Sequence, residues 1–150
     1  MTMVARSRVA TRATGIRRQV FVHVYDDQAE LARAHAEARD RAYDPDDDVA
    51  GGVAIQQGFQ WPRPETTPVV AMRLWTGQLT TRTIAHEATH AAAAFYFMDC
   101  VAGWDSRARA HLMGDHEPLA YLIGDLAAEV TAELYRLGLL PNRPHEEAAG

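Results

Sequence analysis

Hydrophobic and polar positions follow recognisable periods along the chain, and each period predicts a type of element. β-branched and aromatic residues over 20–25 predict a strand, and a second such run over 68–76 predicts a clearer one. A shorter run over 52–56 predicts a third strand. Residues 28–42 are mostly alanine, arginine and glutamate, which predicts a helix with few large apolar side chains.

Two longer segments have the composition and the end signals of helices. The first is expected to begin after a threonine cap at residue 80 or 81 and to reach about residue 98. The second has Pro118 in its first turn and is expected to end near Leu137. Residues 99–115, between them, are expected to be mostly irregular. The pattern predicts an α+β fold in which a small twisted β-sheet packs on two long helices.

Length and charge suggest how the chain is divided. A chain of 150 residues fits one domain, which we place at residues 19–140, with a polar tail over 141–150. The formal net charge is −5, but residues 1–25 hold five arginines and no acidic residue. Residues 1–18 are therefore expected to form a flexible basic arm. Such an arm could contact nucleic acid, a hypothesis ranked last because the remainder of the chain is acidic.

Composition excludes several classes of protein. Hydrophobic residues make up 47% of the chain, which rules out a wholly disordered protein. Cys100 is the single cysteine, so an internal disulfide and a cysteine-only metal site are excluded, and a cytoplasmic location is expected. No apolar run reaches the length of a membrane span, so no membrane association is expected.

The informative motif is His-Glu-Ala-Thr-His at residues 86–90, which matches H-E-x-x-H inside the first long helix. Residues four apart on a helix differ by about 40° around its axis, so His86 and His90 project from one face. Two imidazoles at that spacing can bind one Zn²⁺, while Glu87 stands beside the ion as a general base. The flanking residues are apolar, so we expect a buried helix whose histidines and glutamate would be costly without a metal.

A catalytic zinc needs a third protein ligand, and Glu117 at the start of the second long helix is the preferred candidate. It shares a stripe with small residues, which would let the two helices approach closely and aim Glu117 at the histidines. The alternatives are His116, His111, Asp115 and Glu129.

The chain resembles the zincin metallopeptidases, and more narrowly the small gluzincin-type proteins of bacteria and phages, including the ImmA/IrrE-like group. The resemblance covers about residues 68–137: a strand over 69–75, the H-E-x-x-H motif, and Glu117 on a following helix. It implies that His86, His90 and Glu117 bind zinc and that Glu87 is the general base. It also implies that the strand before the motif is a sheet edge, which pairs with an extended peptide.

These observations lead to two functional hypotheses. The first is a zinc-dependent metallopeptidase that hydrolyses peptide bonds in a peptide or protein substrate, through a water activated by zinc and Glu87. Tyr121, one turn from Glu117, is a candidate for stabilising the oxyanion, as are Tyr96, His111 and His116; simple packing would equally explain Tyr121. The second hypothesis is a zinc-stabilised interaction protein without hydrolytic activity.

Overall fold

The structure is a computed structural model that describes residues 3–38, 40–45, 52–57, 69–101, 105–113 and 117–141. These residues form four strands, four α-helices, a short 3₁₀ turn and one π-helical segment. In chain order they are β1 (Met3–Thr11), β2 (Arg18–Tyr25), α1 (Gln28–Ala38), β3 (Gly52–Gln57), β4 (Val69–Trp75), η1 (Thr76–Gln78), α2 (Thr81–Tyr96), the π-helical η2 (Phe97–Val101), α3 (Ser106–Met113) and α4 (Glu117–Arg136).

The four strands form one mixed sheet in the order β1-β2-β4-β3. The outer pairs β1–β2 and β3–β4 are antiparallel, and the central pair β2–β4 is parallel. Parallel neighbours need a crossover connection, and here that connection contains α1 and β3. The fold class is therefore α+β, as the pattern predicts.

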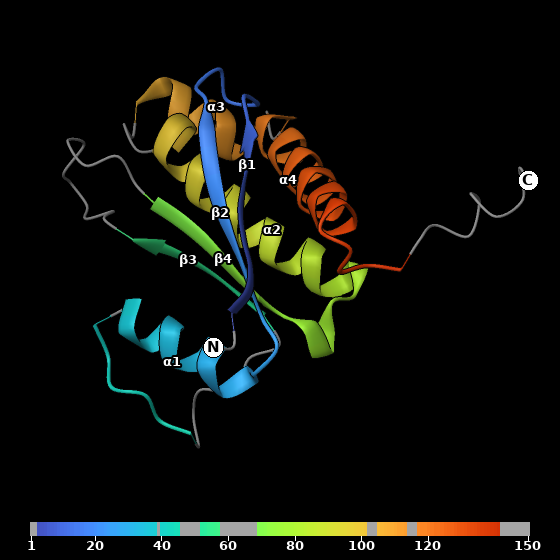
Figure 1. The fold of residues 1–150 in the computed structure, drawn as a ribbon. Coiled ribbons are helices and arrows are strands. Elements are labelled where there is room, and N and C mark those ends of the chain that lie inside the picture. The colour runs from blue at the N-terminus through green and yellow to red at the C-terminus, as the bar shows by residue number, and fades with distance from the viewer. Residues whose placement is uncertain are drawn as a thin grey trace, which may run out of the picture.

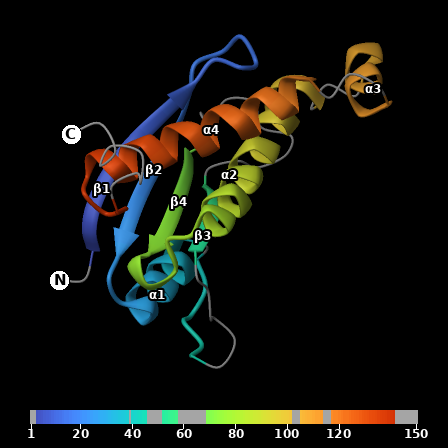
Figure 2. The same ribbon diagram turned by 90° about the vertical axis from the view of Figure 1, so that its right-hand side faces the viewer.

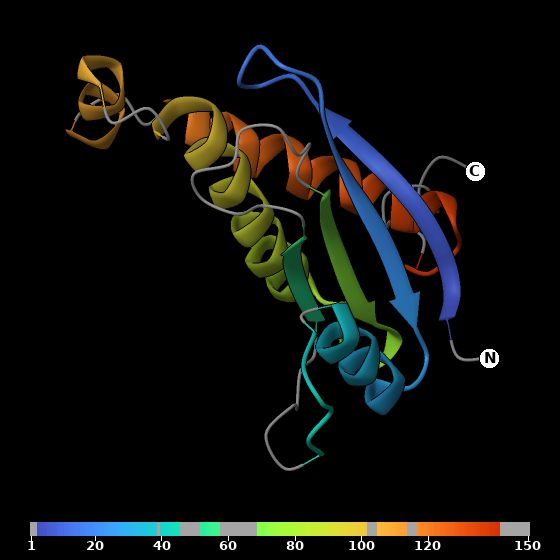
Figure 3. The same ribbon diagram turned by 90° about the vertical axis from the view of Figure 1, so that its left-hand side faces the viewer.

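The two faces of the sheet are covered differently (Figures 1–3). Helices α2 and α4 pack side by side on one face, and α1 packs on the other. Along β2 and β4, every second side chain points into the core beneath α2 and α4. This core joins fully buried residues of both strands with those of both helices: Val20, Val22, Val24, Val70, Met72, Leu74, Ile84, Phe95, Leu122, Leu126, Val130 and Leu134.

The ends of the two long helices follow the signals in the sequence. Thr80 caps α2, its side chain accepting a hydrogen bond of 3.1 Å from the backbone N–H of Thr83. Pro118 lies in the first turn of α4, where its missing N–H is not needed. After α4, Gly138 adopts φ 71°, the left-handed conformation that ends many helices.

The prediction of a flexible arm over residues 1–18 is wrong for the residues that the structure describes. Met3–Thr11 forms β1, which pairs along its length with β2. The arginines at positions 6 and 8 alternate with the small residues Ala5 and Ser7, so one face of the strand packs while the charged face stays exposed. The alternation of small and charged side chains, and not the number of arginines, determines that this segment forms a strand.

The expectation for residues 99–115 also needs correction. Instead of an irregular connection, Phe97–Val101 continues α2 as a π-helix and Ser106–Met113 forms α3. α3 packs against this π-helical segment at the far end of α2 (Figure 2). Among the described helices, none is both long enough and apolar enough to cross a membrane.

Candidate metal centre

The two histidines of the H-E-x-x-H motif project together from the middle of α2. Their Nε2 atoms lie 3.2 Å apart, and the rings meet edge to face with centroids 4.8 Å apart. Two ligands bound to one tetrahedral zinc at about 2.0–2.1 Å are themselves about 3.3 Å apart. The separation of these two nitrogens therefore fits a shared ion, and it also fits a direct N–H···N hydrogen bond between the rings.

The histidine pair lies on the outer side of α2, not in the core. His86 and His90 are both exposed, and the His86 side chain retains 66% of its accessible surface. The expectation of a helix buried all round is wrong, because only one stripe of α2 faces the sheet: Ile84, Ala88, Ala91, Ala92 and Phe95. The burial cost that we assigned to unpaired histidines therefore does not arise.

Glu87 is the member of the motif that is buried, with 4% of its surface exposed. Its Oε1 atom lies 4.0 Å from Nε2 of His86. Because Glu87 is about 100° from His86 around the helix, its carboxylate stands beside the histidine pair and at the margin of the core. A carboxylate in this position can accept a proton from a group held at the histidines.

Glu117 is not brought together with the histidines. It is the first residue of α4 and is exposed. In the portion of the chain that the structure describes, no three His, Cys, Asp or Glu side chains are grouped closely enough to hold a metal ion. The assignment of Glu117 as third ligand stays a prediction.

The stripe of small residues on α4 does not face α2 as we expected. Ala120, Gly124 and Ala128 are exposed, and a side chain added at Gly124 would meet nothing within 4 Å. The helix instead buries its large apolar stripe, Leu122, Leu126, Val130 and Leu134. Burying leucine and valine removes more apolar surface from water than burying alanine, which explains the orientation of the helix.

The other candidate residues have different positions. Tyr121 is 62% exposed, so it is not a packing residue of the core, and its role toward an oxyanion stays a prediction. His111, on α3, is buried and meets the ring of Tyr96 edge to face with centroids 5.7 Å apart. Glu129 lies on the exposed side of α4. The alternatives Asp115 and His116 lie outside the described residues.

The strand before the motif is not a sheet edge. β4 pairs with β2 on one side and with β3 on the other, so both of its edges are occupied. The expectation that this strand pairs with an extended peptide is wrong, because a paired strand has no free backbone N–H and C=O groups along its edge. Among the strands that the structure describes, β1 and β3 are the outer ones.

Two polar features were missed at the sequence level. Asp99, in the π-helical segment, accepts hydrogen bonds from Thr14 at 2.5 Å and from Nε of Arg18 at 3.1 Å, and it also forms an ion pair with Nη2 of Arg18. The second feature is Arg73, which is buried within β4. In the sequence, Arg73 stands out as the single arginine inside an otherwise apolar strand.

Comparisons with known proteins identify no relative of this chain. It matches no protein-family model, and neither the characterised proteins nor the solved structures include a significant match. Any functional conclusion must therefore come from the residues and their geometry.

Proposed function

We propose that the protein is a zinc-dependent metallopeptidase. The observation that carries this proposal is the 3.2 Å separation of the Nε2 atoms of His86 and His90 on an open face of α2, next to a buried carboxylate. Imidazole nitrogens favour zinc over magnesium or calcium, which prefer oxygen ligands.

In this proposal His86 and His90 would hold the ion, and Glu117, which the structure does not place beside them, stays the predicted third ligand. When bound, zinc acts as a Lewis acid toward a peptide carbonyl and lowers the pKa of water. Glu87 accepts a proton at its carboxylate and later returns it to the leaving amine. The exposure of both histidines supports access by a peptide or protein substrate.

The exposed position of the histidines also bears on the second hypothesis, a zinc-stabilised interaction protein. A structural zinc stabilises the fold by joining segments that would not pack stably without the metal. Here the core beneath α2 and α4 is built from apolar residues without the histidines. This favours a catalytic metal over a structural one.

We include a cytoplasmic location in the proposal, supported by the single cysteine, Cys100, whose thiol is buried.

The test of the catalytic role is Glu87→Gln, which keeps the shape of the side chain but removes its ability to accept a proton. Removing a general base costs roughly 10²–10⁴-fold in rate, and we expect a loss in that range. Cleavage of a peptide library would be measured beside the zinc content of the same sample. Glu37→Gln, at an exposed position of α1, is the matched control and should cleave like the wild type.

Two outcomes would contradict the role of Glu87. Cleavage by Glu87→Gln at the wild-type rate would show that this carboxylate is not the base. Loss of zinc from Glu87→Gln would instead make it a ligand. For the third ligand, Glu117→Gln should weaken zinc binding, and unchanged zinc affinity in that variant would remove Glu117 from the centre.

A further inference from the structure

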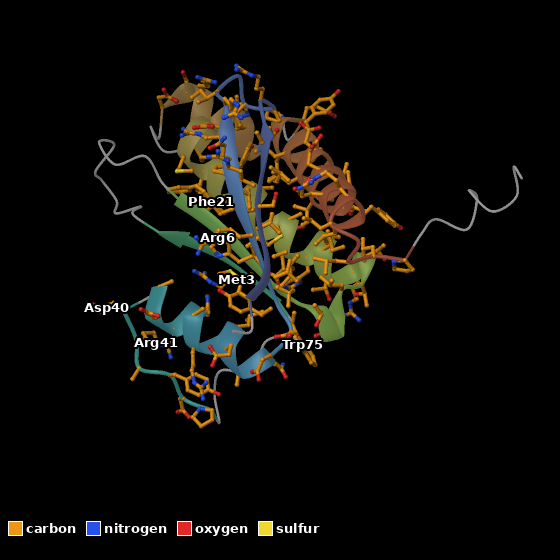
Figure 4. The ribbon with its side chains drawn as sticks, in the orientation of Figure 1. Met3, Arg6, Phe21, Asp40, Arg41 and Trp75 are labelled. Atoms are coloured by element: carbon orange, nitrogen blue, oxygen red, sulfur yellow. The ribbon has the colours of Figure 1, made fainter. Side chains whose placement is uncertain are left out.

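A row of basic side chains crosses the sheet on the face opposite α2 and α4. In the register of the strands, Arg6 of β1 is paired with His23 of β2, and His23 is paired with Arg73 of β4. Adjacent strands lie about 4.8 Å apart, so the three residues are direct cross-strand neighbours. Their side chains share the α1 side of the sheet, because the alternate residues of β2 and β4 point into the core. Figure 4 labels Arg6 and Phe21 along the sheet, above α1 in that view.

Arg73 is an unusual member of this row. Only 7% of its surface is exposed, and its Nε and Nη1 atoms are buried without a hydrogen-bond partner in the part of the chain that the structure describes. A guanidinium stays charged in proteins, and a buried charge without a partner is strongly unfavourable. Such a group indicates a position where an anion completes the hydrogen bonds.

The surroundings of His23 have the same sign of charge. Burial lowers the pKa of His23, and the positive charges of Arg73 and Arg6 lower it further. On the other side of Arg73 the register pairs it with Val53 of β3, which completes the row across the four strands. The row therefore contains no carboxylate. α1, which packs against this face, carries the titratable residues Glu30, Arg33, His35 and Glu37.

We propose that the row Arg6–His23–Arg73 binds a phosphate group. Two guanidinium groups flank one imidazole, and together they offer more donors, in more directions, than one planar carboxylate accepts. A tetrahedral anion that carries up to two negative charges matches this arrangement. Phe21, in the neighbouring row, is half-buried and offers an apolar contact to the group that carries the phosphate.

The phosphate can come from a small molecule or from the backbone of a single-stranded nucleic acid, and the chemistry of recognition is shared. This inference does not rest on the metallopeptidase proposal, since the row and the histidine pair lie on opposite sides of the sheet. Failure of one therefore leaves the other intact.

The experiment is an NMR pH titration of the histidines of the full chain, with inorganic phosphate or a short oligothymidylate at constant ionic strength. A bound anion stabilises the protonated imidazole, so we expect phosphate to raise the pKa of His23 by about one unit. Tighter binding of the oligothymidylate would identify a nucleic-acid backbone as the source, and its failure to bind while phosphate does would identify a small molecule. Arg6→Gln and Arg73→Met should each weaken binding at least about tenfold.

The control is Arg12→Gln, which removes an exposed arginine of the same hairpin outside the row and should bind phosphate almost as the wild type does. The midpoint of thermal unfolding separates binding from a structural role. Arg73→Met removes a buried charge whose Nε and Nη1 atoms have no hydrogen-bond partner among the described residues, so this variant should melt at the wild-type temperature or higher. The proposal is overturned if neither probe shifts His23 in the wild type, or if Arg73→Met binds phosphate as tightly as the wild type.

Discussion

The inner and outer sides of α2 are built from different residues and are suited to different tasks. The inner side carries Ile84, Ala88, Ala91 and Phe95, each at most 1% exposed, and packs against the sheet and α4. One turn of the same helix also presents the imidazoles of the H-E-x-x-H motif on its outer side. Stability therefore depends on the inner side, and the outer side can carry chemistry without disturbing the core.

Glu87 lies where the two sides meet. It belongs to the motif, yet it is as buried as a core residue. A motif that looks continuous in the sequence is divided in space between an exposed pair and a buried partner. The comparison predicts that substitutions on the inner side unfold the protein, whereas substitutions of the histidines leave it folded.

The largest expected effect on stability is that of Phe95→Ala. Phe95 is fully buried, and removing a buried phenylalanine side chain typically costs about 3–5 kcal/mol. His86→Ala, on the outer side of the same helix, should change stability by less than about 0.5 kcal/mol. Urea denaturation of both variants measures the difference. Equal destabilisation would mean that the histidines belong to the structural core.

A smaller loss of stability is expected on substitution of Asp99, in the π-helical segment, which accepts hydrogen bonds from Arg18 and Thr14. The hydrogen bond to Asp99 raises the pKa of Arg18 above its ordinary value. Asp99→Ala leaves the partly buried Arg18 without its charged partner, and we expect a loss of about 2–3 kcal/mol. Denaturant unfolding would be compared with Asp26→Ala, whose side chain lies at an exposed position. A loss no greater than that of the control would show that this contact does not hold the β1–β2 hairpin to the helices.

The smallest effect is expected where α4 meets β1. Hydrogen bonds from Arg136 and then from Ser7 lower the pKa of Glu133 to about 2. This carboxylate therefore stabilises the fold fully above its ordinary pKa near 4.5, and the contribution disappears as the pH falls toward 2. In Glu133→Gln, a stability difference from the wild type of at most about 1 kcal/mol should be present at pH 7 and vanish at acid pH. A difference independent of pH would contradict this ionisation.

Much of the fold could be predicted because local patterns and tertiary packing agree. The helix starts at Thr80 and near Pro118 follow from chemistry confined to one turn. β1 was missed because its exposed arginines hide an alternation that becomes meaningful only when β2 lies beside it. The inner position of β4 could not be predicted either, since the order of strands depends on pairing between distant segments.

The candidate site, like the fold, could be predicted only in part from the sequence. The spacing of His86 and His90 fixes their common face, because both lie on one helix. The exposure of that face depends on which stripe of α2 packs against the sheet, and the position of Glu117 depends on how α4 is oriented. Neither is encoded within a single turn. Arg73 was missed for a similar reason, since a charged residue inside a strand reveals its surroundings only when the neighbouring strands are in place.

The central claim is that His86 and His90 bind one divalent ion together. The most direct measurement is isothermal titration of the metal-stripped protein with zinc, compared with His86→Ala, His90→Ala and, as a control on α1, His35→Gln. We predict one zinc per chain, a loss of at least about 100-fold in affinity in either motif variant, and little change in the control. Equal zinc affinity in all four proteins would contradict the account.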